Sequence, residues 1–267
     1  MTSQSPTPTG SLDNLLNQSR IWRGSINASV GTTHSSGFAD LDHLLPGAGW
    51  PDGGVIEVSL SSFGIGEMRL LGPLMRTLSQ KKAQWILWVA PPFLPYAPAL
   101  AHWGIRTQQM LVIQTQDKKE QLWAMEQGLK SQACSLVLGW PREISPAQLR
   151  RLQLHATQHQ RLCFVFGSPG LLEKASPVSI KMHLESGQKA SADRTDILAI
   201  QMLKRRGGWA MNQPESIRLH SYHLLFSEGL HVENGHALPA PSPLRENQLS
   251  EAGQANIIAG PWISHVG

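Results

Sequence analysis

The sequence GGVIEVSLSSFGIGEMRLL, residues 53–71, holds the strand, the turn and the start of the helix that decide the fold. Residues Val55–Leu60 form a short apolar run that predicts a buried strand. Gly64-Ile65-Gly66 predicts a turn, because glycine adopts backbone conformations that other residues avoid. Beyond the turn, apolar side chains recur at the spacing of one helix face, at Leu70, Leu71, Leu74, Met75 and Leu78. The stretch therefore predicts a strand, a glycine turn and a helix in succession.

The same alternation continues along the chain to about residue 166. Nearly continuous apolar runs predict further strands at Trp85–Ala90, Met110–Ile113, Leu136–Leu138 and Leu162–Phe166. Helices are predicted between them, and Ser145-Pro146-Ala147-Gln148 is a capping box that starts the last one. Strands that are buried on both faces and separated by helices are typical of a parallel sheet. We therefore predict an α/β fold with a mostly parallel sheet flanked by helices.

The pattern changes after residue 178. Three strands follow one another without an intervening helix, at Ser179–Leu184, Ile197–Leu203 and Ser216–His220, which predicts an antiparallel C-terminal edge. Within the first long helix, Gly72-Pro73 is expected to kink it or to move its start. Composition divides the chain into a flexible leader with a short helix (1–35), one domain (36–228) and a mostly disordered tail (229–267).

Composition narrows the class of protein. The chain has 267 residues, a net charge of +4 and only 16% charged residues, against about 25% in an average soluble protein. Its two cysteines, Cys134 and Cys163, lie in apolar runs and are expected to be buried, reduced thiols. The N-terminal residues lack the basic and apolar regions of a secretory signal, and no apolar run is long enough to span a membrane. We expect a cytoplasmic protein without a membrane partner.

Several motifs resemble known families. Ser36-Gly37-Phe38-Ala39-Asp40-Leu41-Asp42 and the following leucines resemble the entry to the RecA-like ATPase core. Arg20-Ile21-Trp22-Arg23-Gly24, Gly49-Trp50-Pro51 and Gly64-Ile65-Gly66-Glu67-Met68-Arg69-Leu70-Leu71 are similar to the mutasome accessory protein ImuA. The stretch from about Gly66 to Gly167 is also similar to the cell-division inhibitor SulA. The resemblance covers roughly residues 20–220 and implies a RecA-like core.

The residues that ATP chemistry needs are missing from that core. A working phosphate-binding loop, G-x-x-x-x-G-K-[ST], uses its lysine on the phosphates and its hydroxyl on Mg²⁺. If Gly66 is the second glycine of such a loop, the first is replaced by Ser61, the lysine by Glu67 and the hydroxyl residue by Met68. Two like charges about 4 Å apart repel by about 4 kcal/mol where the effective dielectric constant is about 20. The loop, with Gly64 at its centre, is therefore interpreted as a degenerate nucleotide-binding loop.

The catalytic carboxylates of such an ATPase are missing too. Pro92 and Trp140 occupy the strand ends where these carboxylates are expected. We therefore lean against an enzyme and expect neither a cofactor nor a metal. Weak nucleotide binding at the helix N-terminus stays open, because the helix dipole does not require lysine.

Two further segments are candidate binding sites. Lys204, Arg205 and Arg206, with Trp209 beside them, form the densest basic run and are a candidate contact for DNA phosphate or an acidic partner. A solvated basic turn at a sheet edge explains the same residues equally well. In the polar tail, Ile257, Ile258, Trp262 and Ile263 form an isolated apolar cluster. This cluster is either a peptide that folds on a partner or a last element that docks on the domain itself.

The resemblance to ImuA implies a function. It predicts a non-catalytic accessory protein of SOS-induced, error-prone translesion DNA synthesis. The implied partners are an inactive, ImuB-like Y-family polymerase relative and an error-prone C-family DNA polymerase, with RecA and single-stranded DNA as further candidates. The resemblance to SulA leaves open an inhibitor of cell division that binds FtsZ. A diverged RecA-like ATPase is the second alternative.

Overall fold

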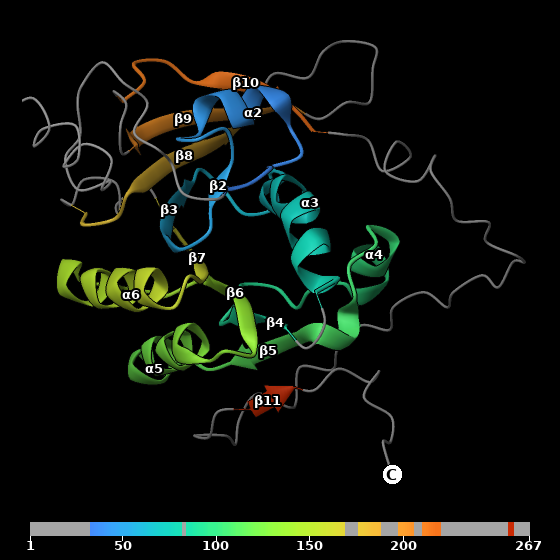
Figure 1. Ribbon diagram of the computed structural model, residues 1–267, viewed down its shortest axis with the longest axis vertical. Helices are drawn as coiled ribbons and strands as arrows, with labels where there is room; N and C mark the ends of the chain where they lie inside the picture. The colour runs from blue at the N-terminus through green and yellow to red at the C-terminus, as the bar shows by residue number, and fades with distance from the viewer. Residues whose placement is uncertain are drawn as a thin grey trace, which may run out of the picture.

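The computed structural model describes residues 33–81, 84–168, 176–187, 197–205, 210–219 and 256–258 (Figure 1). These residues form a nine-stranded sheet with the strand order β10-β9-β8-β3-β7-β6-β4-β5-β11. Its six central strands run parallel and are β3 (Gly54–Leu60), β4 (Trp85–Val89), β5 (Met110–Gln114), β6 (Cys134–Gly139), β7 (Leu162–Gly167) and β8 (Ile180–Ser186).

Antiparallel strands lie at both edges of the sheet. On one side, β9 (Ile197–Arg205) pairs with β8, and β10 (Glu215–Arg218) pairs with β9. On the other side, β11 (Asn256–Ile258) pairs with β5. The predicted antiparallel C-terminal edge is therefore present, and β11 adds a second antiparallel edge from the tail segment.

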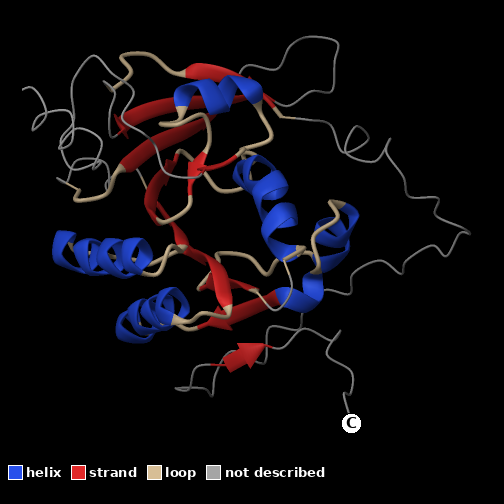
Figure 2. Ribbon diagram, in the orientation of Figure 1, coloured by secondary structure: helices blue, strands red, loops and turns tan. Residues whose placement is uncertain are grey.

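Helices cover both faces of the sheet (Figure 2). One face carries α2 (Ala39–Leu44), α3 (Glu67–Ser79) and α4 (Ala97–His102), which is followed by the short 3₁₀ helix η1 (Thr107–Gln109). The other face carries α5 (Lys118–Lys130) and α6 (Pro146–Gln158), which contact each other. A small two-stranded sheet, β1 (Thr33–His34) with β2 (Trp50–Pro51), lies outside the main sheet.

Each face of the sheet has its own apolar core. In β3, Ile56, Val58 and Leu60 pack in the core beneath α2, α3 and α4, whereas Val55 packs beneath α5 and α6. Two separate apolar cores form because most residues on both faces of the parallel strands are apolar. The predicted mixed α/β architecture with a mostly parallel, helix-flanked sheet is confirmed.

Some details differ from expectation. Helix α3 begins at Glu67, so Gly72-Pro73 does not move its start, and Pro73 lies inside the helix. Pro73 packs against Gly37. A Cβ added to Gly37 would lie 2.6 Å from the Cβ of Pro73. Strand β1 lies within the segment 1–35 that was expected to be a leader, and β11 lies within the expected tail 229–267. The rest of the leader and of the tail is outside the described residues.

Candidate functional site

The loop between β3 and α3 is closed by a side chain of its own helix. Glu67, the first residue of α3, accepts a hydrogen bond from the Gly64 N–H on Oε1 (2.9 Å) and from the Gly66 N–H on Oε2 (3.1 Å). The Glu67 side chain is buried. Backbone N–H groups at a helix N-terminus favour an anion, and here the carboxylate supplies it. Two loop donors that could contact a phosphate are therefore already used.

Glycine is required at this turn for two different reasons. Gly64 and Gly66 have φ angles of +82° and +117°, in the region that side-chain-bearing residues rarely adopt. A Cβ at Gly64 would meet no atom within 4 Å, whereas a Cβ at Gly66 would lie 2.4 Å from Cδ1 of Leu219. The sequence prediction of a glycine turn is thus confirmed, and Gly66 additionally fits against the residue that follows β10.

The other residues of the predicted loop site lie apart from the carboxylate. Ser61 is exposed, and its N–H donates to the carbonyl of Leu184 (3.1 Å). Met68 is half-buried against the core and lines a cavity beside the loop. Of the predicted set, the structure brings together Gly64, Gly66 and Glu67.

Two cavities open where the parallel strands end, next to this loop. A mostly apolar cavity of about 250 Å³ is bounded by Gly64, Glu67 and Met68 on one side and by the chain that follows β4 on the other. A more polar cavity of about 460 Å³ lies over the ends of β4, β5, β6 and β7. Pro91, Pro92 and Trp140 line both. Ligands of open α/β sheets bind at this edge, so the sheet presents its binding edge here.

An aromatic stack forms the floor between the cavities. The ring of Trp140 lies 5.5 Å from that of Trp88 and 4.7 Å from that of Phe166, with nearly parallel planes. The indole N–H groups of Trp88 and Trp140 are buried, and no described residue accepts from them. Ala90 turns the chain after β4 with a φ of +51°, which is uncommon for alanine. Unpaired buried donors and local strain are both typical of binding sites.

Large apolar side chains project from the same edge into solvent. Phe63 in the loop after β3 is 46% exposed, and the segment after β4 exposes Phe93 (72%), Leu94 (51%) and Tyr96 (59%). We name these four residues the carboxyl-edge apolar surface. Monomeric proteins rarely expose such a group of neighbouring apolar side chains unless it is an interaction site. The sequence analysis missed it, because an aromatic residue beside prolines gives no sign of whether it is buried.

The structure describes two residues of the predicted basic run, Lys204 and Arg205. The Nζ of Lys204 donates to the carbonyl of Ser176 (2.7 Å), and Nη1 of Arg205 donates to the carbonyl of Leu44 (2.9 Å). Both cations are therefore engaged with the protein's own backbone. Arg206 and Trp209 lie outside the described residues.

The tail cluster is partly resolved as a strand. Ile257 and Ile258 belong to β11, whose residues pair with Ile113 and Val112 of β5. Of the two interpretations left open by the sequence, this pairing corresponds to docking on the domain itself. Trp262 and Ile263 lie outside the described residues.

Buried polar groups that the sequence analysis did not predict join β3 to β8. Glu57 and Lys181 form an ion pair (Oε1–Nζ 3.2 Å) in which both side chains are almost fully buried. Two residues farther on, Ser59 Oγ lies 3.2 Å from Nδ1 of His183, whose Nε2 lies 2.8 Å from Oε1 of Glu185. A serine, a histidine and a carboxylate in a row suggest a nucleophile, but Ser59 is only 1% exposed inside the sheet. We therefore interpret these polar side chains as contacts that hold β3 against β8.

The thiols and histidines add no reactive centre to this part of the chain. Burial raises the pKa of Cys134 to about 11 and raises the pKa of Cys163 further. His155 and His159, four residues apart at the end of α6, have ring centroids 6.4 Å apart. Within the described ranges, no three His, Cys, Asp or Glu side chains gather in a way that could hold a metal ion. None of the helices described there is both long and apolar enough to cross a membrane.

Comparison with known proteins finds similar sequences for part of this chain. A family model described as "Cell division inhibitor SulA" matches residues 55–163, from β3 to the start of β7. The cell division inhibitor SulA of Edwardsiella piscicida is 32% identical over 110 residues, which cover 40% of this chain and 64% of that protein. The protein ImuA of Caulobacter vibrioides (strain NA1000 / CB15N) is 27% identical over 124 residues, which cover 45% and 51%.

A solved structure also matches. The crystal structure of SulA from Pseudomonas aeruginosa is 26% identical, and the alignment covers 42% of this chain and 95% of that one, with a TM-score of 0.36. The chain spans between about one half and two thirds of the length of the two curated relatives. It is related to the SulA and ImuA proteins.

Proposed function

We propose that this relative of the SulA and ImuA proteins is a non-catalytic adaptor of the DNA-damage response that acts in error-prone translesion DNA synthesis. Its partners in this proposal are an inactive Y-family polymerase relative and an error-prone C-family polymerase, with RecA as a further candidate. The adaptor binds these proteins at the carboxyl edge of its sheet, the position at which nucleotide-binding α/β proteins hold a ligand.

The observation that carries the proposal is the position of the Glu67 carboxylate on the N–H groups of Gly64 and Gly66. A phosphate at this loop would have to displace a buried carboxylate or be placed against it, and both cost free energy. No lysine follows Gly66 to offset the charge, because that position is Glu67 itself. The loop then serves to fix the start of α3, and nucleotide hydrolysis plays no part.

The carboxyl-edge apolar surface supports protein binding as the alternative use of this edge. Aromatic side chains are enriched among the residues that dominate protein interfaces, because they bury a large apolar area when a partner docks. Phe93 and Tyr96 are exposed beside a cavity that can receive a partner's side chain. The side chains of Lys204 and Arg205, in contrast, donate to backbone carbonyls of the protein itself, so contact with single-stranded DNA through them is not part of the proposal.

A second candidate function is inhibition of cell division by binding FtsZ. The observation that favours it is the extent of the SulA family match, residues 55–163. That segment contains the whole carboxyl-edge apolar surface and the residues that line the smaller cavity. The same surface would then bind a different protein.

The test is co-elution on size exclusion of the full chain with each purified partner from the same cell. One run contains the inactive Y-family polymerase relative, and the other contains FtsZ with GTP. We expect a complex with the polymerase relative. A complex with FtsZ alone would replace the adaptor function by the second candidate, and the absence of both complexes would contradict both functions.

Two variants show whether the complex uses the proposed surface. The double variant Phe93→Ser, Tyr96→Ser removes exposed side chains, so the fold is retained while the partner's affinity falls by at least about tenfold. Leu154→Ser is the matched control, because Leu154 is equally exposed (61%) on α6 away from this edge. Equal binding by the double variant and the control would move the interface elsewhere.

A further inference from the structure

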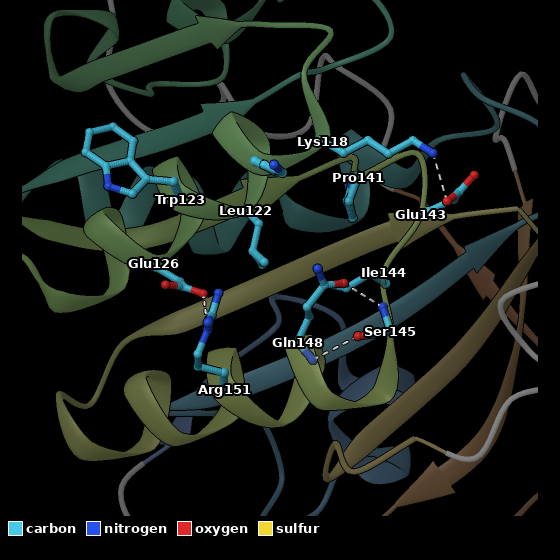
Figure 3. A pocket seen from close by; sticks show the side chains of 11 residues that line it. Lys118, Leu122, Trp123, Glu126, Pro141, Glu143, Ile144, Ser145, Gln148 and Arg151 are labelled. Atoms are coloured by element: carbon cyan, nitrogen blue, oxygen red, sulfur yellow. Dashed lines mark hydrogen bonds and ion pairs between the residues drawn. The ribbon is translucent and has the colours of Figure 1, made fainter.

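A second surface on the molecule lies in a groove between α5 and α6. It encloses about 500 Å³ and is lined by residues of both helices and of the segment that joins β6 to α6 (Figure 3). Three apolar side chains, Leu122, Pro141 and Ile144, form its buried part. Charged side chains surround them, so the groove has the apolar centre and polar rim of a protein interface.

Two ion pairs cross the groove, and they differ in strength. Arg151 of α6 contacts Glu126 of α5, and this carboxylate is nearly buried, so the pair fixes the two helices together (Figure 3). Lys118 contacts Glu143 (2.8 Å), but these side chains are 55% and 75% exposed. An exposed ion pair contributes little free energy. A carboxylate from another molecule can therefore replace Glu143 on Lys118 at little cost.

One cation and one aromatic ring of the groove are available to a partner. Lys119 lines the groove and has no ion-pair partner among the residues that the structure describes. Trp123 follows one helical turn later and is 62% exposed. In Figure 3 its ring points away from Gln148 and Arg151. A tryptophan exposed to this extent beside an apolar groove is a typical hot-spot residue. The groove lining carries three cations and two carboxylates, so its excess charge is positive.

We propose that this groove binds an acidic peptide segment of another protein. An aromatic or aliphatic side chain of the peptide packs on Trp123 and over Leu122 and Ile144, and its carboxylates contact Lys119 and Lys118. Single-stranded nucleic acid fits the groove less well, because it carries a phosphate at every nucleotide. A peptide can place carboxylates opposite Lys118 and Lys119 and neutral residues opposite Glu126 and Glu143. The groove is a surface distinct from the carboxyl-edge apolar surface, so its binding is independent of the proposed adaptor function.

The probe for this proposal is a library of random twelve-residue peptides, selected on the immobilised full chain. Peptides that bind are then synthesised with a fluorescent label, and their affinity is measured by anisotropy. We expect the selected sequences to combine acidic with aromatic or aliphatic residues. Lys119→Glu and Trp123→Ala should each weaken their binding by at least about tenfold, and higher salt should weaken it further.

The controls separate this groove from nonspecific attraction. Lys130→Glu changes the same charge on the same helix, outside the groove lining, and should leave the affinity unchanged. Selected peptides without acidic residues, or equal weakening by Lys119→Glu and Lys130→Glu, would overturn the proposal. A labelled oligothymidylate that binds in place of the acidic peptides, and is lost in Trp123→Ala, would assign the groove to single-stranded nucleic acid instead.

Discussion

Glu67 decides the chemistry of the loop after β3 in two ways. Its carboxylate accepts from two backbone N–H groups that would otherwise be short of partners at the start of α3. The same carboxylate places a negative charge where a nucleotide would place its phosphates. A single residue thus stabilises the turn and, under the proposed function, disfavours a phosphate on the same N–H groups.

At the two glycines, the backbone geometry predicts unequal effects of alanine. Both have positive φ, which costs an alanine about 1–2 kcal/mol, but only at Gly66 would the new Cβ overlap Leu219. Gly66→Ala should therefore lower the free energy of unfolding by about 2–4 kcal/mol, and Gly64→Ala by about 1–2 kcal/mol. Urea unfolding of both variants measures this difference. Equal losses would mean that Leu219 does not pack against the loop.

The two cysteines should be unreactive in the folded protein. Because burial raises the pKa of Cys134 to about 11 and that of Cys163 further, almost no thiolate forms at pH 8. Alkylation by iodoacetamide, read by mass spectrometry, should modify neither thiol in buffer and both in denaturant. Raising the pH toward 11 should accelerate the reaction at Cys134 first. Rapid modification at pH 8 would show that the β6 region opens readily.

Between elements, the buried ion pair connects β3 to β8. Removing one member of a buried pair leaves a charge without its partner and costs about 3–5 kcal/mol, whereas replacing both by apolar residues is often neutral. Glu57→Leu and Lys181→Met should each destabilise the protein by that amount, and the double variant should unfold near the wild-type urea concentration. Additive losses in this double-mutant cycle would contradict a direct coupling of the two residues.

Strand β11 should protect the edge strand β5. Its three residues pair with Gln114, Ile113 and Val112, and proline cannot donate to such a ladder. Ile257→Pro should therefore speed hydrogen exchange of the β5 amides by at least about tenfold. The amides of β10 at the opposite edge serve as the internal control. Unchanged exchange in β5 would show that the pairing contributes nothing to this edge.

The elements that sequence analysis predicted correctly are those with a local signal. The strands β3, β4, β6 and β7 are mostly apolar runs, and the capping box at Ser145 and Gln148 starts α6 as expected. Trp85 begins a predicted strand but is 36% exposed, because it is the first residue of β4, at the rim of the sheet. Apolar composition alone does not separate a strand's end from its buried centre.

The parts that sequence could not predict depend on distant contacts. Glu57 and Lys181 pair only because β8 lies beside β3 in the sheet. Trp123 lies on the solvent side of α5, and Phe93 follows a turn, so their exposure depends on the three-dimensional packing. In the loop, Gly64, Gly66 and Glu67 were predicted from the sequence to belong to a degenerate nucleotide-binding loop. The hydrogen bonds from the glycine N–H groups to the Glu67 carboxylate could be found only from the structure.

For the whole molecule, the two surfaces have different chemistry and lie on different elements. The carboxyl-edge apolar surface follows β3 and β4. The groove is lined by α5 and α6, which cover the face of the sheet opposite α3 and α4 (Figure 1). If both proposals hold, the two surfaces would let one molecule bind two proteins at once, and each surface can be tested without the other.

The most direct test of this account is an NMR titration of the isotope-labelled full chain with ATP and Mg²⁺. If Glu67 occupies the loop donors, the amide signals of Gly64 and Gly66 should not shift, while Glu67→Ala should make them sensitive to inorganic phosphate. Saturable shifts of both signals in the unmodified protein would show that the loop binds nucleotide and would contradict the account.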